Sequence, residues 1–172
     1  MRLGTAILRV VVGGLFVGHG GQKLFGWFGG HGPEGTGQFF ESGLGLAPGR
    51  RQAQTAGAAE LGGGALLATG IATPLAAAAL TGSMVTAIRK VHLDKGPWVS
   101  EGGFEYNAVV LAVLFALTDE TSGPGWALAQ LAAGAGSSWL VTGPLNEPAS
   151  GQATGAGPSP DEQLAGDPAS TA

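Results

Sequence analysis

Titratable side chains stand inside apolar stretches of this chain, at spacings that suit ion pairing, proton transfer or ligand binding. They are Arg9, His19, Lys23, Glu60, Arg89, His92 and Glu105, with Tyr106 beside the last of them. Ionisable residues in such stretches are costly and usually face a bundle interior, a partner or a water-filled cavity. His19 and Lys23 are four residues apart and share a helix face, and Arg9 lies near the same stripe. These residues predict either a polar pocket for a small molecule or protons, or a salt-bridge cluster that fixes helix register.

The absence of other reactive groups narrows the chemistry of such a pocket. The chain has no cysteine, which excludes disulfides, zinc–thiolate sites, iron–sulfur clusters and covalently attached haem. No P-loop, H-E-x-x-H motif or Ser–His–Asp order is present, and no metal site is expected. His19 and His92 have no further histidine at haem-pair spacing, so haem is disfavoured. A quinone headgroup needs only one or two hydrogen-bond partners and an apolar slot, which a histidine, Tyr106 or Trp98 would supply.

Composition indicates a membrane protein. The 172 residues suffice for one domain. Charged residues make up 12%, about half the usual share, and mean hydropathy is +0.25. The net charge of −4 and the absence of a basic patch argue against a nucleic-acid partner. We therefore predict a small all-α multi-span protein whose main partner is the lipid bilayer.

Four apolar segments must position the titratable residues, and we predict that they form a four-helix membrane bundle. They are residues 3–28, 53–69, 75–88 and 104–117. The first reaches the length of about 20 residues that a membrane helix needs. A cleaved signal peptide is the rival interpretation of this segment, but no clear A-x-A site follows it. The other three are shorter and must include flanking residues to span.

Two longer connections, residues 29–52 and 94–103, are predicted to be loops because glycine and proline interrupt them. In the first, Phe39 and Phe40 would lie against the bilayer surface or plug the bundle. Antiparallel helices place both loops on one side of the membrane. The basic residues at these loops favour a cytoplasmic location for both and an external amino terminus. They are Arg50, Arg51, Arg89, Lys90 and Lys95.

The same connectivity brings the charged residues of different segments into one half of the membrane. Lys23 or Arg89 is then expected to pair with Glu60 or Glu105, because pairing makes buried charge tolerable. Within the first segment, Gly14 and Gly18 form a small-xxx-small pair. Such glycines let helix backbones approach closely, so we expect tight helix packing there.

The carboxy-terminal part divides at residue 146. Residues 126–141 are apolar but rich in glycine and serine, and they predict either a fifth membrane helix or a helix that packs on the bundle or lies on the interface. Residues 147–172 consist mostly of Pro, Gly, Ser, Ala and acids, which is typical of a disordered tail. The expected organisation is a membrane domain over 1–125, an extra helix within 126–146 and an acidic tail.

Four motifs in order resemble the DoxX family of small bacterial integral membrane proteins. They are Arg9 with GLF at 14–16 and HGGQKLFG at 19–26, AELGG at 59–63, residues 84–87 with His92, and GGFEY at 102–106. The resemblance covers about residues 2–125. The chain departs from the family after Gly125, where an expected Ser-x-Asp is missing, and in its acidic tail.

The resemblance implies a multi-pass protein of the bacterial cytoplasmic membrane with a four-helix core. Relatives include subunits similar to those of quinone-linked oxidoreductase complexes, and some are associated with oxidative-stress and thiol-redox partners. The expected function is therefore an accessory or scaffold subunit whose polar cluster binds a quinone-like ligand or a redox partner protein. Both a monomer and an oligomer are compatible with the sequence. A permease-like or lipid-binding protein and a purely structural partner are the alternatives. A catalyst acting alone is the least favoured.

Overall fold

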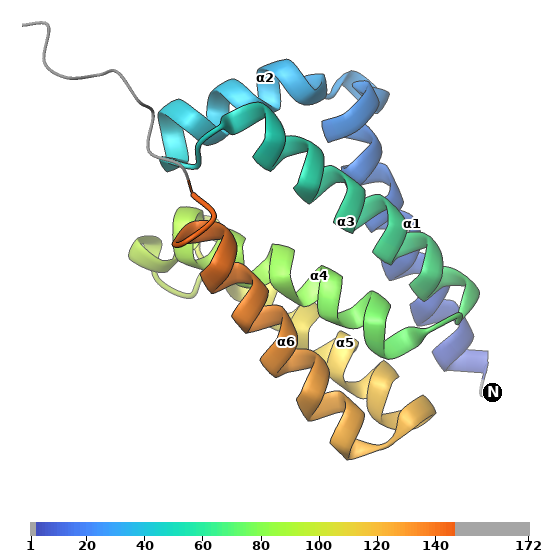
Figure 1. Cartoon of the computed structure of the whole chain (residues 1–172). Coiled ribbons are helices and arrows are strands. Elements are labelled where there is room, and N and C mark those ends of the chain that lie inside the picture. Colours follow the sequence, from blue (N-terminus) through green and yellow to red (C-terminus); the bar gives the residue numbers. More distant parts are fainter. Residues whose placement is uncertain (1–2, 147–172) are drawn as a thin grey trace, which may run out of the picture.

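The computed structural model describes residues 3–146, and all regular structure in that range is helical. The α-helices are α1 (Leu3–Phe25), α2 (Gly32–Gln38), α3 (Gly49–Thr69), α4 (Thr73–Ala87), α5 (Glu105–Ser122) and α6 (Pro124–Thr142). Figure 1 shows α1 packed along α3, while α4, α5 and α6 form a second group that joins the first through the turn between α3 and α4. The predicted all-α bundle is confirmed.

Glycines allow α1 and α3 to pack backbone against backbone. A Cβ atom at Gly13 would lie 2.5 Å from the carbonyl oxygen of Gly64, and one at Gly20 would lie 2.6 Å from that of Gly57. The pair that the sequence singles out has no such role. A Cβ at Gly14 would meet no atom within 4 Å, and one at Gly18 would meet only a ring carbon of Phe28, at 4.0 Å. The expectation of tight packing is right, but it is carried by a neighbouring face of the helix.

The segment at 126–141 is part of α6, which packs along α4. Gly134 approaches Thr81 so closely that an added Cβ would lie 2.5 Å from its methyl carbon. One turn away, the Thr81 hydroxyl donates a buried hydrogen bond of 2.8 Å to the side-chain oxygen of Gln130. The segment is therefore a helix that packs on the bundle, and whether it also spans the membrane stays a prediction.

The first long connection contains helical structure that the sequence did not predict. Within residues 29–52, α2 begins at Gly32 with Pro33 in its first turn, where proline is favourable, and a π-helical turn, Phe39–Gly43, follows it. Gly37 of α2 lies against the backbone of Gly49 and Arg50, so this packing compensates for the low helix propensity of the segment. The prediction of a loop was wrong here.

The carboxyl ends of α4 and α5 also differ from the prediction. A second π-helical turn, Ile88–His92, prolongs α4, and α5 continues to Ser122, past the predicted end at residue 117. Threonines hold the extra turn, since Thr121 Oγ1 donates to the carbonyl of Leu117 at 2.8 Å. The polar residues at the carboxyl end of α5 therefore extend this helix rather than end it.

The two long connections lie at one end of the bundle, as antiparallel connectivity requires. Lys90 Nζ donates to the carbonyl of Leu44 at 3.3 Å. At the same end, Asn146 donates to the carbonyl of Gly45 at 2.8 Å and accepts from the backbone N–H of Ala47 at 2.6 Å. We call this the loop end, and the opposite end, where α3 turns into α4, the turn end.

Among the helices of residues 3–146, α1 alone is both long and apolar enough to cross a membrane by itself, with 23 residues and a hydropathy of 1.5. Its outward side carries exposed apolar side chains: Leu3, Ile7, Leu8, Val10, Val11 and Leu15. The main hydrophobic core lies between the two helix groups, toward the turn end. It consists of Phe16, Leu67, Ala76, Ala77, Leu80, Met84, Val110, Leu114 and Leu117.

Candidate functional site

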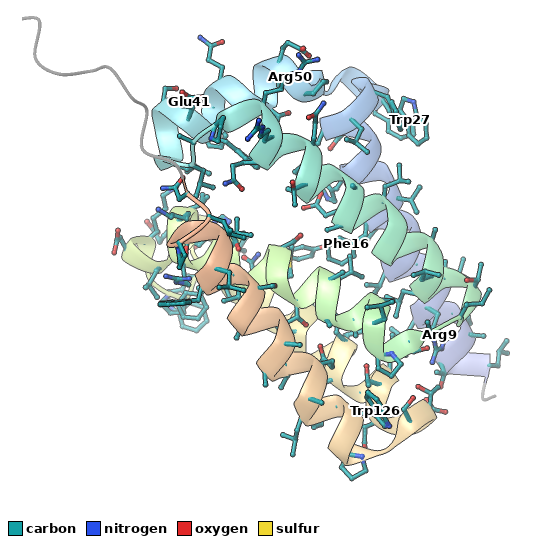
Figure 2. All side chains as sticks on the ribbon, viewed as in Figure 1. Arg9, Phe16, Trp27, Glu41, Arg50 and Trp126 are labelled. Atoms are coloured by element: carbon teal, nitrogen blue, oxygen red, sulfur yellow. The ribbon has the colours of Figure 1, made fainter. Side chains whose placement is uncertain are left out.

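A cavity of about 550 Å³ separates the two helix groups on the loop-end side of this core. Its size lies within the range of roughly 300–1,000 Å³ that is usual for small-molecule sites. One wall comes from α1, α3 and the turn Phe39–Gly43, and the other comes from α4, α6 and the start of α5. Figure 2 shows Phe16 between the ribbons of α3 and α4, where it forms part of the cavity floor. Phe39 and Phe40 both line the cavity, and Phe39 is also 53% exposed.

An ion pair stands in the first wall. Lys23 Nζ lies 2.5 Å from Glu60 Oε2, and the two side chains are 21% and 7% exposed. Lys23 is in the last turn of α1, where the helix dipole favours a cation. The predicted pairing of Lys23 with Glu60 is therefore present, and it places both members of a salt bridge on the wall of an otherwise apolar cavity.

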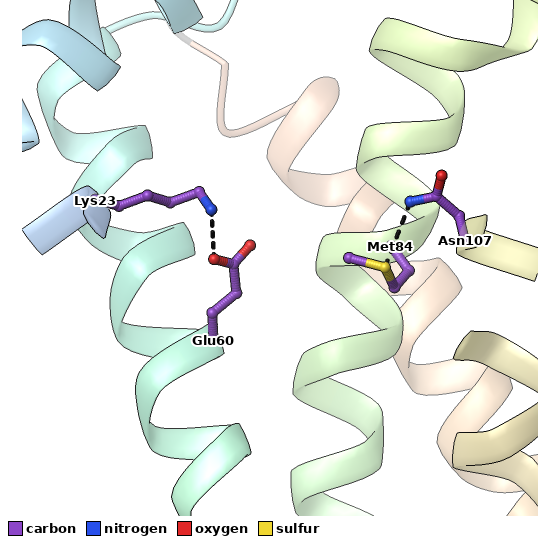
Figure 3. A network of polar contacts seen from close by, with 4 residues as sticks. All are labelled: Lys23, Glu60, Met84 and Asn107. Atoms are coloured by element: carbon purple, nitrogen blue, oxygen red, sulfur yellow. Dashed lines mark hydrogen bonds and ion pairs between the residues drawn. The ribbon is translucent and has the colours of Figure 1, made fainter. Parts of the chain in front are cut away.

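The sulfur of Met84 and the imidazole of His92 line the opposite wall, and the Asn107 amide lies behind Met84. Figure 3 shows Met84 and Asn107 across the gap from the Lys23–Glu60 pair, with the Asn107 amide donating to Met84 Sδ at 3.4 Å. His92 Nδ1 lies 2.6 Å from the carbonyl of Gly102, which only accepts, so this nitrogen is the donor. The neutral His92 ring then keeps Nε2 as an acceptor.

The cavity brings together five of the eight residues that the sequence predicts for a site. These are His19, Lys23, Glu60, His92 and Tyr106. Arg89 stands just behind the wall, where its Nη1 donates to Ser138 Oγ at 3.3 Å, and Ser138 lines the cavity. Arg89 pairs with this serine rather than with a carboxylate because α6 lies against α4 and offers the nearer acceptor.

Glu105 is outside the cavity lining, and the expected ion pair with Lys23 or Arg89 is not among the salt bridges within residues 3–146. It is the first residue of α5, and its Oε2 accepts a hydrogen bond of 2.9 Å from the backbone N–H of Val99. The carboxylate therefore turns back to the preceding connection, and its position in the first turn also suits the helix dipole.

The sequence matches the DoxX family over residues 4–93. It is 35% identical over 116 residues to "Putative oxidoreductase CatD" of Bacillus subtilis (strain 168), a match that covers 67% of this chain and 79% of that protein. The chain belongs to the DoxX family. No solved structure matches it.

The DoxX match includes the polar half of the cavity. It begins in α1 and ends just after His92, so the Lys23–Glu60 pair and both cavity histidines lie within it. Tyr106 and α6 lie beyond the matched range. The apolar segment that became α6 nevertheless contributes Ser137, Ser138 and Val141 to the cavity lining.

Arg9 occupies a separate buried position at the turn end. Figure 2 shows it near the start of α4, and it does not line the cavity. The side chain is 1% exposed, and it donates to Thr73 Oγ1 at 2.8 Å and to the carbonyl of Leu117 at 3.4 Å. It thus connects α1, α4 and α5. The ends of α3 and α5 lie beside it, and the partial negative charge of helix carboxyl ends stabilises a cation.

We predict that Arg9→Ala lowers the free energy of unfolding by about 2–4 kcal/mol, because it removes a large buried side chain and two charge-assisted hydrogen bonds. Arg9→Met keeps most of the volume and is expected to lose less. Unfolding of the purified protein in mild detergent, followed by circular dichroism, measures both. Arg50→Ala, at a side chain that is 65% exposed, is the control and should change stability by under about 1 kcal/mol. Equal losses at positions 9 and 50 would contradict the buried role.

Several residues of the cavity were not candidates from the sequence. Met84, which lines the cavity, and its partner Asn107, which does not, belong to apolar runs, where single polar or sulfur-containing residues usually indicate packing. Ser137 and Ser138 interrupt the apolar segment 126–141, and this was a usable signal, since neighbouring hydroxyls in such a segment need partners. Ser138 indeed accepts from Thr86 Oγ1 at 2.9 Å as well as from Arg89.

Proposed function

We propose that this DoxX protein is a multi-pass protein of the bacterial cytoplasmic membrane that serves as an accessory subunit in a quinone-linked redox or oxidative-stress system. In this proposal the cavity between the two helix groups binds a quinone-like ligand. One observation carries it: a mainly apolar cavity of about 550 Å³ whose polar lining includes one ion pair, two imidazoles and a phenol beside an amide and several hydroxyl groups. The oxidoreductase name of the Bacillus subtilis relative supports the redox part.

The residues present fit a quinone. Its two carbonyl oxygens accept hydrogen bonds, and Lys23, Tyr106 and the imidazole of His19 are donors on the cavity lining. Phe16 and Phe40 offer aromatic surface for a ring. Lys23 is paired with Glu60, so the lining presents a donor without an uncompensated charge against a neutral ligand. A bound quinone would supply electron exchange, while the residues of this chain would bind and orient it.

We propose an accessory role because the sequence offers few reactive groups of its own. The 172 residues contain no thiol, and no nucleophile constellation is present in the sequence. A redox partner protein would therefore supply the electrons that reduce a bound quinone or accept the electrons of a bound quinol. The loop end, with its basic residues, is the side we propose for the cytoplasm.

Quinone binding is testable on the purified protein. We expect the protein in lipid nanodiscs to bind a naphthoquinone saturably, as measured by quenching of tryptophan fluorescence. His19→Ala and Glu60→Gln should each weaken this binding at least tenfold, because they remove or disturb groups on the cavity lining. Glu34→Gln changes an exposed carboxylate that pairs with Arg50 at 2.9 Å, and it should leave binding unchanged.

Two results would count against the proposal. If His19→Ala and Glu60→Gln both bind the naphthoquinone as the parent does, the cavity is not the site. If the purified protein retains phospholipid and binds no quinone, the alternative of a lipid-binding or permease-like protein without redox chemistry replaces it. Circular dichroism of each variant shows that the helices are intact, so lost binding is not lost folding.

A further inference from the structure

Exposed side chains on the cavity lining show where the cavity reaches the protein surface, and they lie on two sides. On one side are Leu15 and His19 of α1 and Tyr106 of α5, with Leu15 51% and Tyr106 52% exposed. On the other side are Thr55 of α3 and Ser137 of α6. The first opening lies beside the strongly apolar outer surface of α1, whereas the second is bordered by hydroxyl groups.

The two ends of the cavity are closed. At the turn end, the packed core around Phe16 and Leu80 fills the space between the helix groups. At the loop end, residues 44–47, which lead from the turn Phe39–Gly43 into α3, contact the second helix group, and we call this segment the strap. Lys90 and Asn146 hold the strap by hydrogen bonds to Leu44, Gly45 and Ala47. Leu46 of the strap is buried and lines the cavity, so the strap covers its loop end.

The opening beside the apolar surface of α1 favours ligands that come from the bilayer. A water-soluble molecule would have to pass the strap at the loop end or use the second opening, beside Thr55 and Ser137. A molecule dissolved in the bilayer would approach along the exposed apolar side chains of α1, which continue from Leu15 to Val11 and Leu8. The polar groups deeper in the cavity, Lys23 and Glu60, would then receive the polar head of such a molecule.

We infer that the ligand is a lipid-soluble amphiphile, whose head lies at the Lys23–Glu60 pair and whose long apolar tail leaves between α1 and α5 through the opening formed by Leu15, His19 and Tyr106. This inference rests on the proposed function and makes it more specific: the quinone carries an isoprenoid tail and reaches the cavity from the bilayer. We call the opening the lateral portal.

The test compares one quinone ring with and without its tail. A tryptophan at Leu15 would obstruct the portal, while a tryptophan at Val11, one turn earlier on α1 and 53% exposed, is the matched control because Val11 does not line the cavity. We expect Leu15→Trp to weaken binding of a long-chain menaquinone at least tenfold and to leave binding of the tail-less naphthoquinone within twofold. Val11→Trp should change neither affinity.

The possible outcomes separate this inference from the proposed function. If both quinones bind the parent protein and Leu15→Trp weakens neither, or weakens both alike, the lateral portal is wrong and quinone binding stands. If neither quinone binds, the proposed function fails, and a phospholipid with a diazirine in its head group then decides the portal. Crosslinks to Met84 and its neighbours on the cavity wall would support lateral access. Crosslinks confined to outward residues such as Val11 and Trp139 would overturn it.

Discussion

Gly20→Ala is expected to lower the free energy of unfolding by about 3 kcal/mol, because the added methyl group meets the backbone of α3. It would lie 2.6 Å from the Gly57 carbonyl oxygen and 2.7 Å from Leu61 Cβ. Backbone atoms of a helix cannot turn aside as a flexible side chain can, so α1 and α3 must move apart. Equilibrium unfolding in mild detergent, followed by circular dichroism, measures the loss.

Gly14→Ala provides the control on the same helix. No atom lies within 4 Å of the added Cβ, and alanine has the higher helix propensity, so we expect unchanged or slightly increased stability. Both changes add one methyl group to α1, so a difference in stability between them reports the surroundings of the position and not the substitution itself. Equal effects at positions 14 and 20 would show that α1 does not present this face to α3.

Breaking the Lys23–Glu60 pair is expected to have the second large effect. Lys23→Met leaves the Glu60 carboxylate, whose side chain is 7% exposed, without its partner, and losing one partner of a buried ion pair costs about 3–5 kcal/mol. The double variant Lys23→Met with Glu60→Met removes both charges and should recover most of that loss. A double-mutant cycle in detergent unfolding experiments gives the coupling free energy between the two positions.

The exposed ion pair between Arg50 and Glu34 is the matched comparison for this cycle. Its atoms lie 2.9 Å apart, but the side chains are 65% and 67% exposed, so solvent screens the interaction and the coupling should stay under about 1 kcal/mol. A similar coupling for the two pairs would mean that the cavity wall at Glu60 is wetter than its burial indicates. The lack of any recovery in the double Met variant would contradict the direct contact.

Local sequence pattern was sufficient for the helices and for part of the site. The apolar run that starts at Leu3 carries a period and length that only a helix satisfies in a membrane, and it became α1. The four-residue spacing of His19 and Lys23 places them on neighbouring turns, and both line the cavity. Antiparallel connectivity was sufficient to place Lys23 and Glu60 in the same half of the bundle, and of the pairings that the sequence left open the structure has this one.

Local pattern failed where packing compensates for weak propensity or where helix ends are polar. Residues 32–38 are rich in glycine, yet α2 forms because its backbone rests on the start of α3. Glu105 was expected among the paired charges, but its exact place at the beginning of α5 directs it to the backbone of Val99. Such outcomes depend on neighbours that are distant in sequence.

The sequence by itself determined that this chain is all-helical and that charged groups from α1 and α3 meet near one end, because periodicity, length and connectivity can be read along the chain. Its ordered motifs determined that it is of the DoxX type. Only the tertiary structure decided which face of α1 meets α3. Gly13 and Gly20 are buried there while Gly14 and Gly18 face outward, a rotation of the helix that glycine spacing cannot fix. It also decided that α6 lies on α4 and that a cavity remains between the helix groups, since cavities arise from the mutual fit of surfaces that no single segment encodes.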